Sequence, residues 1–153
     1  MRRATEADAR ALAAHEPPGA DVAASHLRAQ ERGEAIFLVA VAERSDAEER
    51  LGSGVLVLGE VPELRHLHVL PQARGAGVGS ALTAAAEQEA RALGATEIAM
   101  GVGDDNPRAR ALYERLGYLA TGRISTTTYE YVDDDGVRRT ATETDEELRK
   151  PLR

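Results

Sequence analysis

The apolar positions of this chain fall into short continuous runs that are separated by polar or glycine-rich segments. Two runs, Ala35–Val41 and Gly54–Leu58, are typical of strands buried on both faces. A third apolar run, Leu64–Leu70, leads into a glycine-rich loop and then into the alanine-rich, helix-like segment Val78–Leu93. The pattern therefore predicts a strand, a glycine loop and a helix in direct succession.

Helix-capping and turn residues divide the N-terminal part of the chain. Thr5 and Asp8 form a capping pattern that predicts a helix over residues 6–14, after a strand of about three residues. A second helix is expected from Asp21 to Arg32, where Gly33 ends it. The segment Glu43–Arg50 is interpreted as a charged turn between the two apolar strands.

The C-terminal part predicts one more strand–helix unit and a hairpin. Ala95–Val102 has the pattern of a strand, and Asn106-Pro107 opens a helix that Gly117 closes. Two segments rich in Thr, Tyr and Val follow, Tyr118–Val132 and Val137–Thr144, joined by the turn Asp134-Asp135-Gly136. Crossover helices combined with a terminal antiparallel hairpin favour an α/β fold with a mixed sheet flanked by helices.

In the predicted strand Glu63–Val69 the apolar residues do not alternate regularly with polar ones. Strict alternation would place Leu67 and Val69 on one face of the strand and Leu64 on the other. One extra, bulged residue between Leu64 and Leu67 would bring all three apolar side chains to the same face. We therefore expect a β-bulge in this strand.

The loop Gln72–Ser80, called the glycine loop below, has the composition of an anion site. The first N–H groups of a helix lack intrahelical partners, and the helix dipole adds partial positive charge there. Gly75, Gly77 and Gly79 keep side chains away from these amides, and Arg74 adds a fixed positive charge. The loop is thus interpreted as a pyrophosphate-binding segment.

Spacing separates this loop from two other phosphate-binding motifs. No lysine precedes Ser80, as a nucleoside-triphosphatase loop requires, and the glycines do not have the spacing of a dinucleotide fingerprint. The run resembles instead the (Gln/Arg)-x-x-Gly-x-(Gly/Ala) loop of the GNAT superfamily of N-acetyltransferases. The segment Asn106–Tyr118 is similar to a second motif of that family, Asn-x-x-Ala-x-x-Leu-Tyr-x-x-x-Gly-(Phe/Tyr).

The resemblance implies a single GNAT-like domain over residues 1–153, with a splayed mixed sheet, and acetyl coenzyme A as co-substrate. It implies transfer of the acetyl group to a primary amine by direct attack in a ternary complex. A non-catalytic acyl-coenzyme-A-binding sensor or interaction module of the same fold is the alternative. The resemblance places the cofactor contacts at Leu67, His68, Val69, Arg74, Gly75, Ala76, Gly77, Val78, Gly79, Ser80, Asn106 and Tyr113.

Two catalytic residues follow from the resemblance and from the chemistry that the reaction needs. An alkylammonium with a pKa of about 10.4 must lose a proton before it attacks, and the departing thiolate benefits from gaining one. Glu63 is the candidate base, with a solvent-facing strand residue as the alternative interpretation. Tyr113 is the candidate acid, or else a tyrosine packed on a core-facing helix. Asn106 is also a good helix N-cap, so it has a structural interpretation beside cofactor contact.

His66 and His68 lie two residues apart on the predicted strand, a spacing compatible with metal binding. The sequence offers no third ligand at a recognisable spacing, so we expect no metal site and interpret His68 as a residue that lines the pocket. His15 and His26 belong to no motif.

Composition limits the remaining classes of function. The chain has 153 residues, no cysteine and a formal net charge of −7. It therefore offers no disulfide and no cysteine nucleophile, and its charge disfavours nucleic acid and favours a cationic acceptor. Its N-terminal residues do not resemble a secretory signal and it has no long apolar run, so we expect a cytoplasmic protein without membrane contact. A homodimer is left open.

Overall fold

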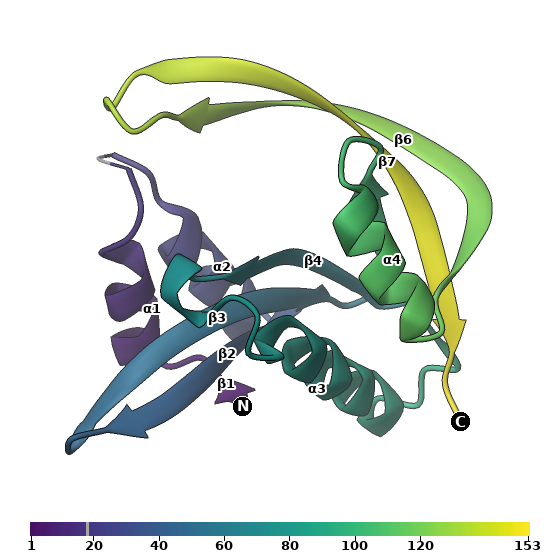
Figure 1. Cartoon of the computed structure of the whole chain (residues 1–153), viewed down its shortest axis with the longest axis horizontal. Helices are drawn as coiled ribbons and strands as arrows, with labels where there is room; N and C mark the ends of the chain where they lie inside the picture. The colour runs from purple at the N-terminus through teal and green to yellow at the C-terminus, as the bar shows by residue number, and fades with distance from the viewer. Residues whose placement is uncertain (18) are drawn as a thin grey trace.

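The computed structural model describes residues 1–17 and 19–153, which form a seven-stranded mixed sheet with helices on both faces (Figure 1). The strand order is β1-β2-β3-β4-β5-β7-β6, in which only β4 and β5 pair in parallel within the described chain. The elements are β1 (Arg2–Arg3), α1 (Glu6–Ala13), α2 (Val22–Glu31), β2 (Ala35–Arg44), β3 (Ala47–Val57), β4 (Glu63–Val69), a 3₁₀ turn (Pro71–Ala73), α3 (Val78–Ala92), β5 (Glu97–Gly103), α4 (Pro107–Arg115), β6 (Leu119–Val132) and β7 (Arg138–Pro151).

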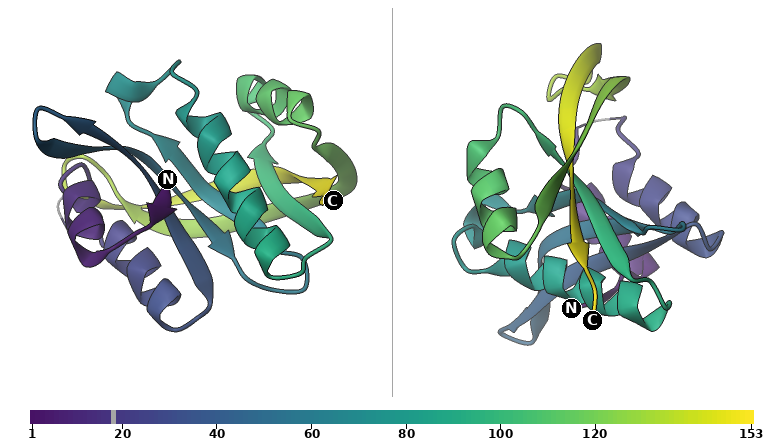
Figure 2. Two further views of the ribbon diagram at one scale, coloured as in Figure 1. Left: turned by 90° about the horizontal axis from the view of Figure 1, so that it is seen from below. Right: turned by 90° about the vertical axis from the view of Figure 1, so that its right-hand side faces the viewer.

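The sheet separates two apolar clusters, and residues of β2 alternate between them. Ile36 and Leu38 pack with α3 and α4 on one face, whereas Phe37 and Val39 pack with α1 and α2 on the other. Figure 2 shows the two helix pairs on opposite sides of the sheet. Burial on both faces explains why β2 is a continuous apolar run, as its sequence predicted.

The predicted turn over Glu43–Arg50 is wrong, because most of this segment extends the β2–β3 hairpin. Only Ser45 and Asp46 form the turn, both with positive φ (47° and 68°), as a two-residue hairpin loop requires. The ladder continues to Arg44 opposite Ala47, beyond the edge of the core. Backbone pairing there needs no buried side chain, so the charged residues of this segment remain exposed. The sequence therefore had no apolar pattern from which the strands could be predicted.

The C-terminal hairpin is longer than predicted. Its second strand was expected to end at Thr144 but continues to Pro151, pairing with β5 along Glu97–Gly103. Leu148 of this extension is fully buried in the core cluster beneath α3. The β6–β7 hairpin arches over β4 towards α1 and α2 (Figure 1).

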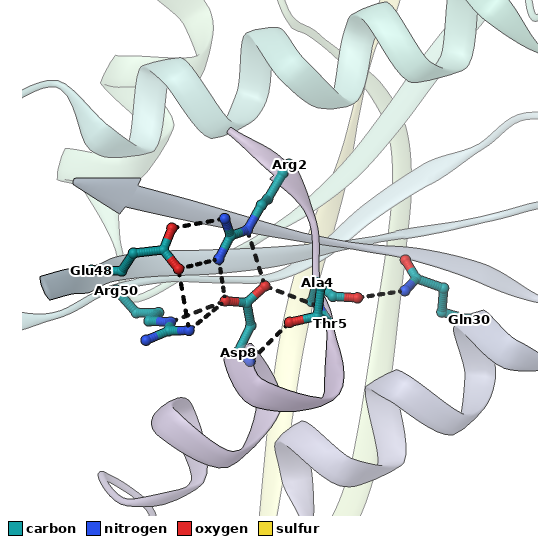
Figure 3. Close-up of polar contacts among 7 residues, drawn as sticks. All are labelled: Arg2, Ala4, Thr5, Asp8, Gln30, Glu48 and Arg50. Atoms are coloured by element: carbon teal, nitrogen blue, oxygen red, sulfur yellow. Dashed lines mark hydrogen bonds and ion pairs between the residues drawn. The ribbon is translucent and has the colours of Figure 1, made fainter. Parts of the chain in front are cut away.

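A buried carboxylate, Asp8, fastens α1 to the sheet (Figure 3). It completes the predicted capping box with Thr5 and also accepts hydrogen bonds from the guanidinium groups of Arg2 and Arg50. Glu48 accepts two further bonds from Arg2. Burial alone would raise the pKa of Asp8, but the hydrogen bonds from Arg2, from the Thr5 backbone and from Arg50 outweigh it and hold the pKa well below its usual range.

We predict that Asp8→Asn lowers the free energy of unfolding at pH 7 by about 2–3 kcal/mol, because it leaves two guanidinium groups without their shared carboxylate. Since the folded pKa lies below the unfolded value of about 3.9, the carboxylate stabilises the fold fully above that value and progressively less as the pH falls. Urea unfolding between pH 7 and pH 3 should therefore show a smaller loss of stability on acidification in Asp8→Asn than in the wild type.

Glu6→Gln is the matched control, because Glu6 lies on the same helix and makes only an exposed pair with Arg10. If acidification from pH 7 to pH 3 lowered the free energy of unfolding equally in the wild type and in Asp8→Asn, the role given to the buried carboxylate would be contradicted.

Candidate functional site

The glycine loop has the geometry that its sequence predicts. Gly75 and Gly77 have φ values of 81° and 80°, in the left-handed region that favours glycine. Gly77 is the N-cap of α3, and no side chain in the described part of the chain caps that helix end. A β-carbon at either glycine would meet no atom within 4 Å, so the space beside the loop is open.

Arg74 lies at the entrance to this loop, where its exposed side chain turns back so that Nε donates to the carbonyl oxygen of Val69 at 3.4 Å. Uncapped helix amides and a guanidinium therefore lie together at the carboxyl end of β4. Such an arrangement can bind a phosphate or pyrophosphate group.

The predicted bulge in β4 is confirmed. The β3–β4 register passes from Ser53 opposite His68 to Val55 opposite Arg65, so two residues of β4 lie opposite Gly54. One of these, His66, has a φ of 55°, which is uncommon for a residue with a side chain. Leu64 is buried in the core cluster with α3, and Leu67 and Val69 pack against that cluster, so the three apolar residues share one face as expected.

The bulge coincides with a gap in the sheet. β4 and β5 pair only through Glu63 with Ala99 and Leu64 with Met100, after which they separate. On its other edge β4 approaches β3 so closely that a β-carbon on Gly52 would lie 2.6 Å from the carbonyl oxygen of His68. The β5-facing edge of residues 65–69 has no strand partner among the described residues, so its backbone groups can bind a ligand.

Glu63, the candidate base, begins β4 beside this gap and is about one third exposed. Its carboxylate oxygens accept hydrogen bonds from Nε and a terminal nitrogen of Arg65, at 2.8 and 3.1 Å. Proton transfer to Glu63 therefore competes with an ion pair that the sequence analysis did not anticipate.

Tyr113, the candidate acid, is half-buried on α4 and packs against the core cluster. Its ring lies 6.3 Å from that of Tyr118 in an edge-to-face arrangement, and the Tyr118 hydroxyl donates to buried Glu87. Burial raises the pKa of Tyr113, so its hydroxyl carries a proton at neutral pH. The structural interpretation of Asn106 is confirmed: its side chain accepts from the N–H of Ala109 and caps α4.

A pocket of about 290 Å³ lies between helices α1 and α2 and the middle of the sheet, and all four histidines of the chain line it. His15 and His26 had no sequence signal, because His15 lies in the turn after α1 and His26 lies on α2, and both approach His66 and His68 only through the fold. Among the described residues the lining is Leu12, His15, Glu16, Val22, Ala23, His26, Phe37, Ser53, His66, Leu67, His68 and Leu70.

The four histidines can also be compared with known metal-ligand arrangements. Across residues 1–17 and 19–153, no group of three or more His, Cys, Asp or Glu side chains has an arrangement that could hold a metal ion. None of the helices in the described chain combines the length and apolar character needed to span a membrane.

Comparison with known families gives one match, in which residues 5–118 fit the model of the acetyltransferase (GNAT) family. No curated protein sequence matches the chain.

Several solved structures share the fold. Nourseothricin acetyltransferase is 26% identical over 80% of this chain and 68% of its own, with a TM-score of 0.62. A ribosomal-protein-alanine N-acetyltransferase from Brucella melitensis is 24% identical over 99% of this chain and 98% of its own, with a TM-score of 0.68. A GNAT family acetyltransferase from Elizabethkingia anophelis, solved with acetyl-CoA bound, is 18% identical over 82% of each chain, with a TM-score of 0.61.

Proposed function

Because the chain belongs to the acetyltransferase (GNAT) family, we propose that it transfers an acetyl group from acetyl coenzyme A to a primary amine, with both substrates bound at once. The observation that carries the proposal is the pairing of an uncapped α3 N-terminus with an unpartnered edge of β4. The first would hold the pyrophosphate through residues 74–80. The second would hold the pantetheine arm through the backbone of Leu67, His68 and Val69.

We expect acetyl coenzyme A to raise the melting temperature, since a ligand that binds only the folded state stabilises it. Gly77→Asp should abolish this shift, because it places a carboxylate beside the amides that would bind the pyrophosphate. Thermal unfolding with and without acetyl coenzyme A measures the effect.

Gly77→Asn is the matched control, because asparagine has nearly the same shape as aspartate and tolerates positive φ but carries no charge. It should retain part of the shift. An undiminished shift in Gly77→Asp would mean that the pyrophosphate binds elsewhere.

In the proposed reaction the amine nitrogen attacks the thioester carbonyl, the N–C bond forms and the C–S bond breaks. A backbone N–H in the segment 67–69 polarises the carbonyl oxygen, and Tyr113 donates its proton to the departing thiolate. The chain has no cysteine that could carry the acetyl group, so holding both substrates in contact supplies much of the rate.

Tyr113→Phe should lower kcat about 100-fold while leaving the melting shift with acetyl coenzyme A nearly intact, because it removes one positioned proton donor and keeps the ring. Release of free thiol measures turnover. Tyr118→Phe is the control, since it removes the neighbouring hydroxyl, which donates to Glu87. Wild-type turnover in Tyr113→Phe would assign this proton to water.

Glu63 is proposed to take the proton of the acceptor amine, directly or through a water molecule. Arg65 binds both of its oxygens, so the base would exchange this ion pair for the incoming ammonium. The negative charge of Glu63 supports this role, because Glu63 lies two residues before the point at which the backbone of β4 becomes free of β5.

Glu63→Gln should lower kcat/KM strongly for an alkylamine and much less for an arylamine, because an arylamine is already unprotonated at pH 7. The acidic limb of the pH profile should change with the alkylamine only. Arg65→Gln is the control: it breaks the same ion pair and leaves the carboxylate in place. Equal losses in Glu63→Gln and Arg65→Gln would mean that the pair supports the strand and Glu63 takes no proton.

A further inference from the structure

One wall of the histidine pocket is a row of flat rings. His26 of α2 packs against Phe37 of β2 in an edge-to-face arrangement, with ring centroids 5.4 Å apart. On its other side His26 lies 4.8 Å from the ring of His66, with the ring planes tilted by 37°. The row therefore runs from the buried core below α2 to the bulge of β4.

The middle ring of the row is uncharged at neutral pH. The Nε2 atom of His26 is buried and has no hydrogen-bond partner among the described residues. Burial lowers the pKa of His26 to about 4, and the neighbouring His66 contributes to this shift. Burial and the charge of Arg65 likewise lower the pKa of His66. The two imidazoles that line this part of the pocket are thus mainly neutral at neutral pH.

The remaining lining has few groups that could bind the second ammonium of a ligand with two positive charges. Leu12, Val22, Ala23, Leu67 and Leu70 contribute apolar residues to the lining. Glu16 is the one carboxylate among the lining residues, and its Oε1 already accepts the backbone N–H groups of Val22 and Ala23. The described residues that line the pocket include no lysine or arginine.

Acidic side chains gather instead near the His66 end of the row. The negative charges of Glu143 and Glu63 oppose the lowering of the His66 pKa, which places both carboxylates within electrostatic reach of that ring. Asp145, on the same strand as Glu143, packs 3.5 Å from where a β-carbon of Gly101 would lie. The negative charge therefore lies at the gap between β4 and β5, and the interior of the pocket is mainly apolar.

We propose that the acceptor is an arylalkylamine, whose flat ring stacks in the histidine pocket and whose amine points past His66 to the gap between β4 and β5. This inference rests on the proposed acetyl transfer and names its substrate class. A volume of about 290 Å³ accommodates a benzene-sized ring with a short alkyl chain, because an engineered cavity of about 150 Å³ already binds benzene. An extended polyamine would leave its second ammonium among neutral rings.

Four acceptors test the proposal with the full chain and acetyl coenzyme A: 2-phenylethylamine, 2-cyclohexylethylamine, ethylamine and spermidine. We expect the lowest KM for 2-phenylethylamine, about 3- to 10-fold below that of its saturated analogue, since ring stacking adds to the hydrophobic gain. Spermidine should have a kcat/KM below that of 2-phenylethylamine. Equal KM values for the flat and the saturated ring, or a preference for spermidine, would overturn the proposal.

His26→Phe and His26→Leu separate ring stacking from simple filling of space. The leucine variant should raise the KM for 2-phenylethylamine several-fold more than the phenylalanine variant, with little change in kcat. Both should have small effects on ethylamine, which does not fill the pocket. Leu93→Ala, at an exposed position beyond α3, is the control for unspecific effects. A larger KM in the phenylalanine variant than in the leucine variant would count against stacking.

Binding of the amine can also be measured without turnover. Because all four histidines line this pocket, their side-chain NMR signals should shift on addition of 2-phenylethylamine in the presence of coenzyme A. Shifted signals without thiol release from any amine would overturn the proposed acetyl transfer and leave the ring site supported. Thiol release from alkylamines, with histidine signals that do not respond to 2-phenylethylamine, would keep the transferase proposal and overturn the ring site.

Discussion

The central constraint in this molecule is that β4 must pair fully with β3 while giving up its pairing with β5. The bulge at His66 meets both demands, because one extra residue changes the phase of the strand without ending its ladder with β3. The same change keeps Leu64, Leu67 and Val69 against the core cluster of α3. The strained backbone at His66 is thus held in place by this core packing, and Gly52 and Gly54 of β3 leave room for the close approach of β4.

Two binding features follow from that irregular strand, one at its end and one on its face. The carboxyl end of β4 leads directly into the glycine loop, so the free backbone edge and the uncapped N-terminus of α3 are continuous in the chain. The bulge turns the His66 ring towards α2, where it meets His26. A cofactor bound along the strand and an acceptor in the histidine pocket would therefore meet at the same gap in the sheet.

The helices beside the histidine pocket, α1 and α2, are fixed by polar contacts as well as by their apolar cluster. Asp8 joins α1 to Arg2 and Arg50, and Gln30 of α2 bonds the backbone of Ala4 and Phe37. Figure 3 shows the contacts of Asp8 and the bond from Gln30 to Ala4, on the two sides of the chain segment that enters α1. Such anchoring allows His26 to hold its ring against Phe37 although its Nε2 atom has no hydrogen-bond partner among the described residues, a cost that a fixed site can tolerate.

Local sequence determined the features whose physical cause is local. Glycines at positive φ, helix caps and the broken apolar phase of β4 act within a few residues, so the loop, the helix boundaries and the bulge could be predicted. The hairpin over residues 43–50 and the C-terminal half of β7 depend on partner strands, and the sequence alone misjudged them. Only the tertiary structure brought His15 and His26 to His66 and His68 and paired Glu63 with Arg65, because these contacts depend on the packing of α1 and α2 and on side-chain orientation in β4.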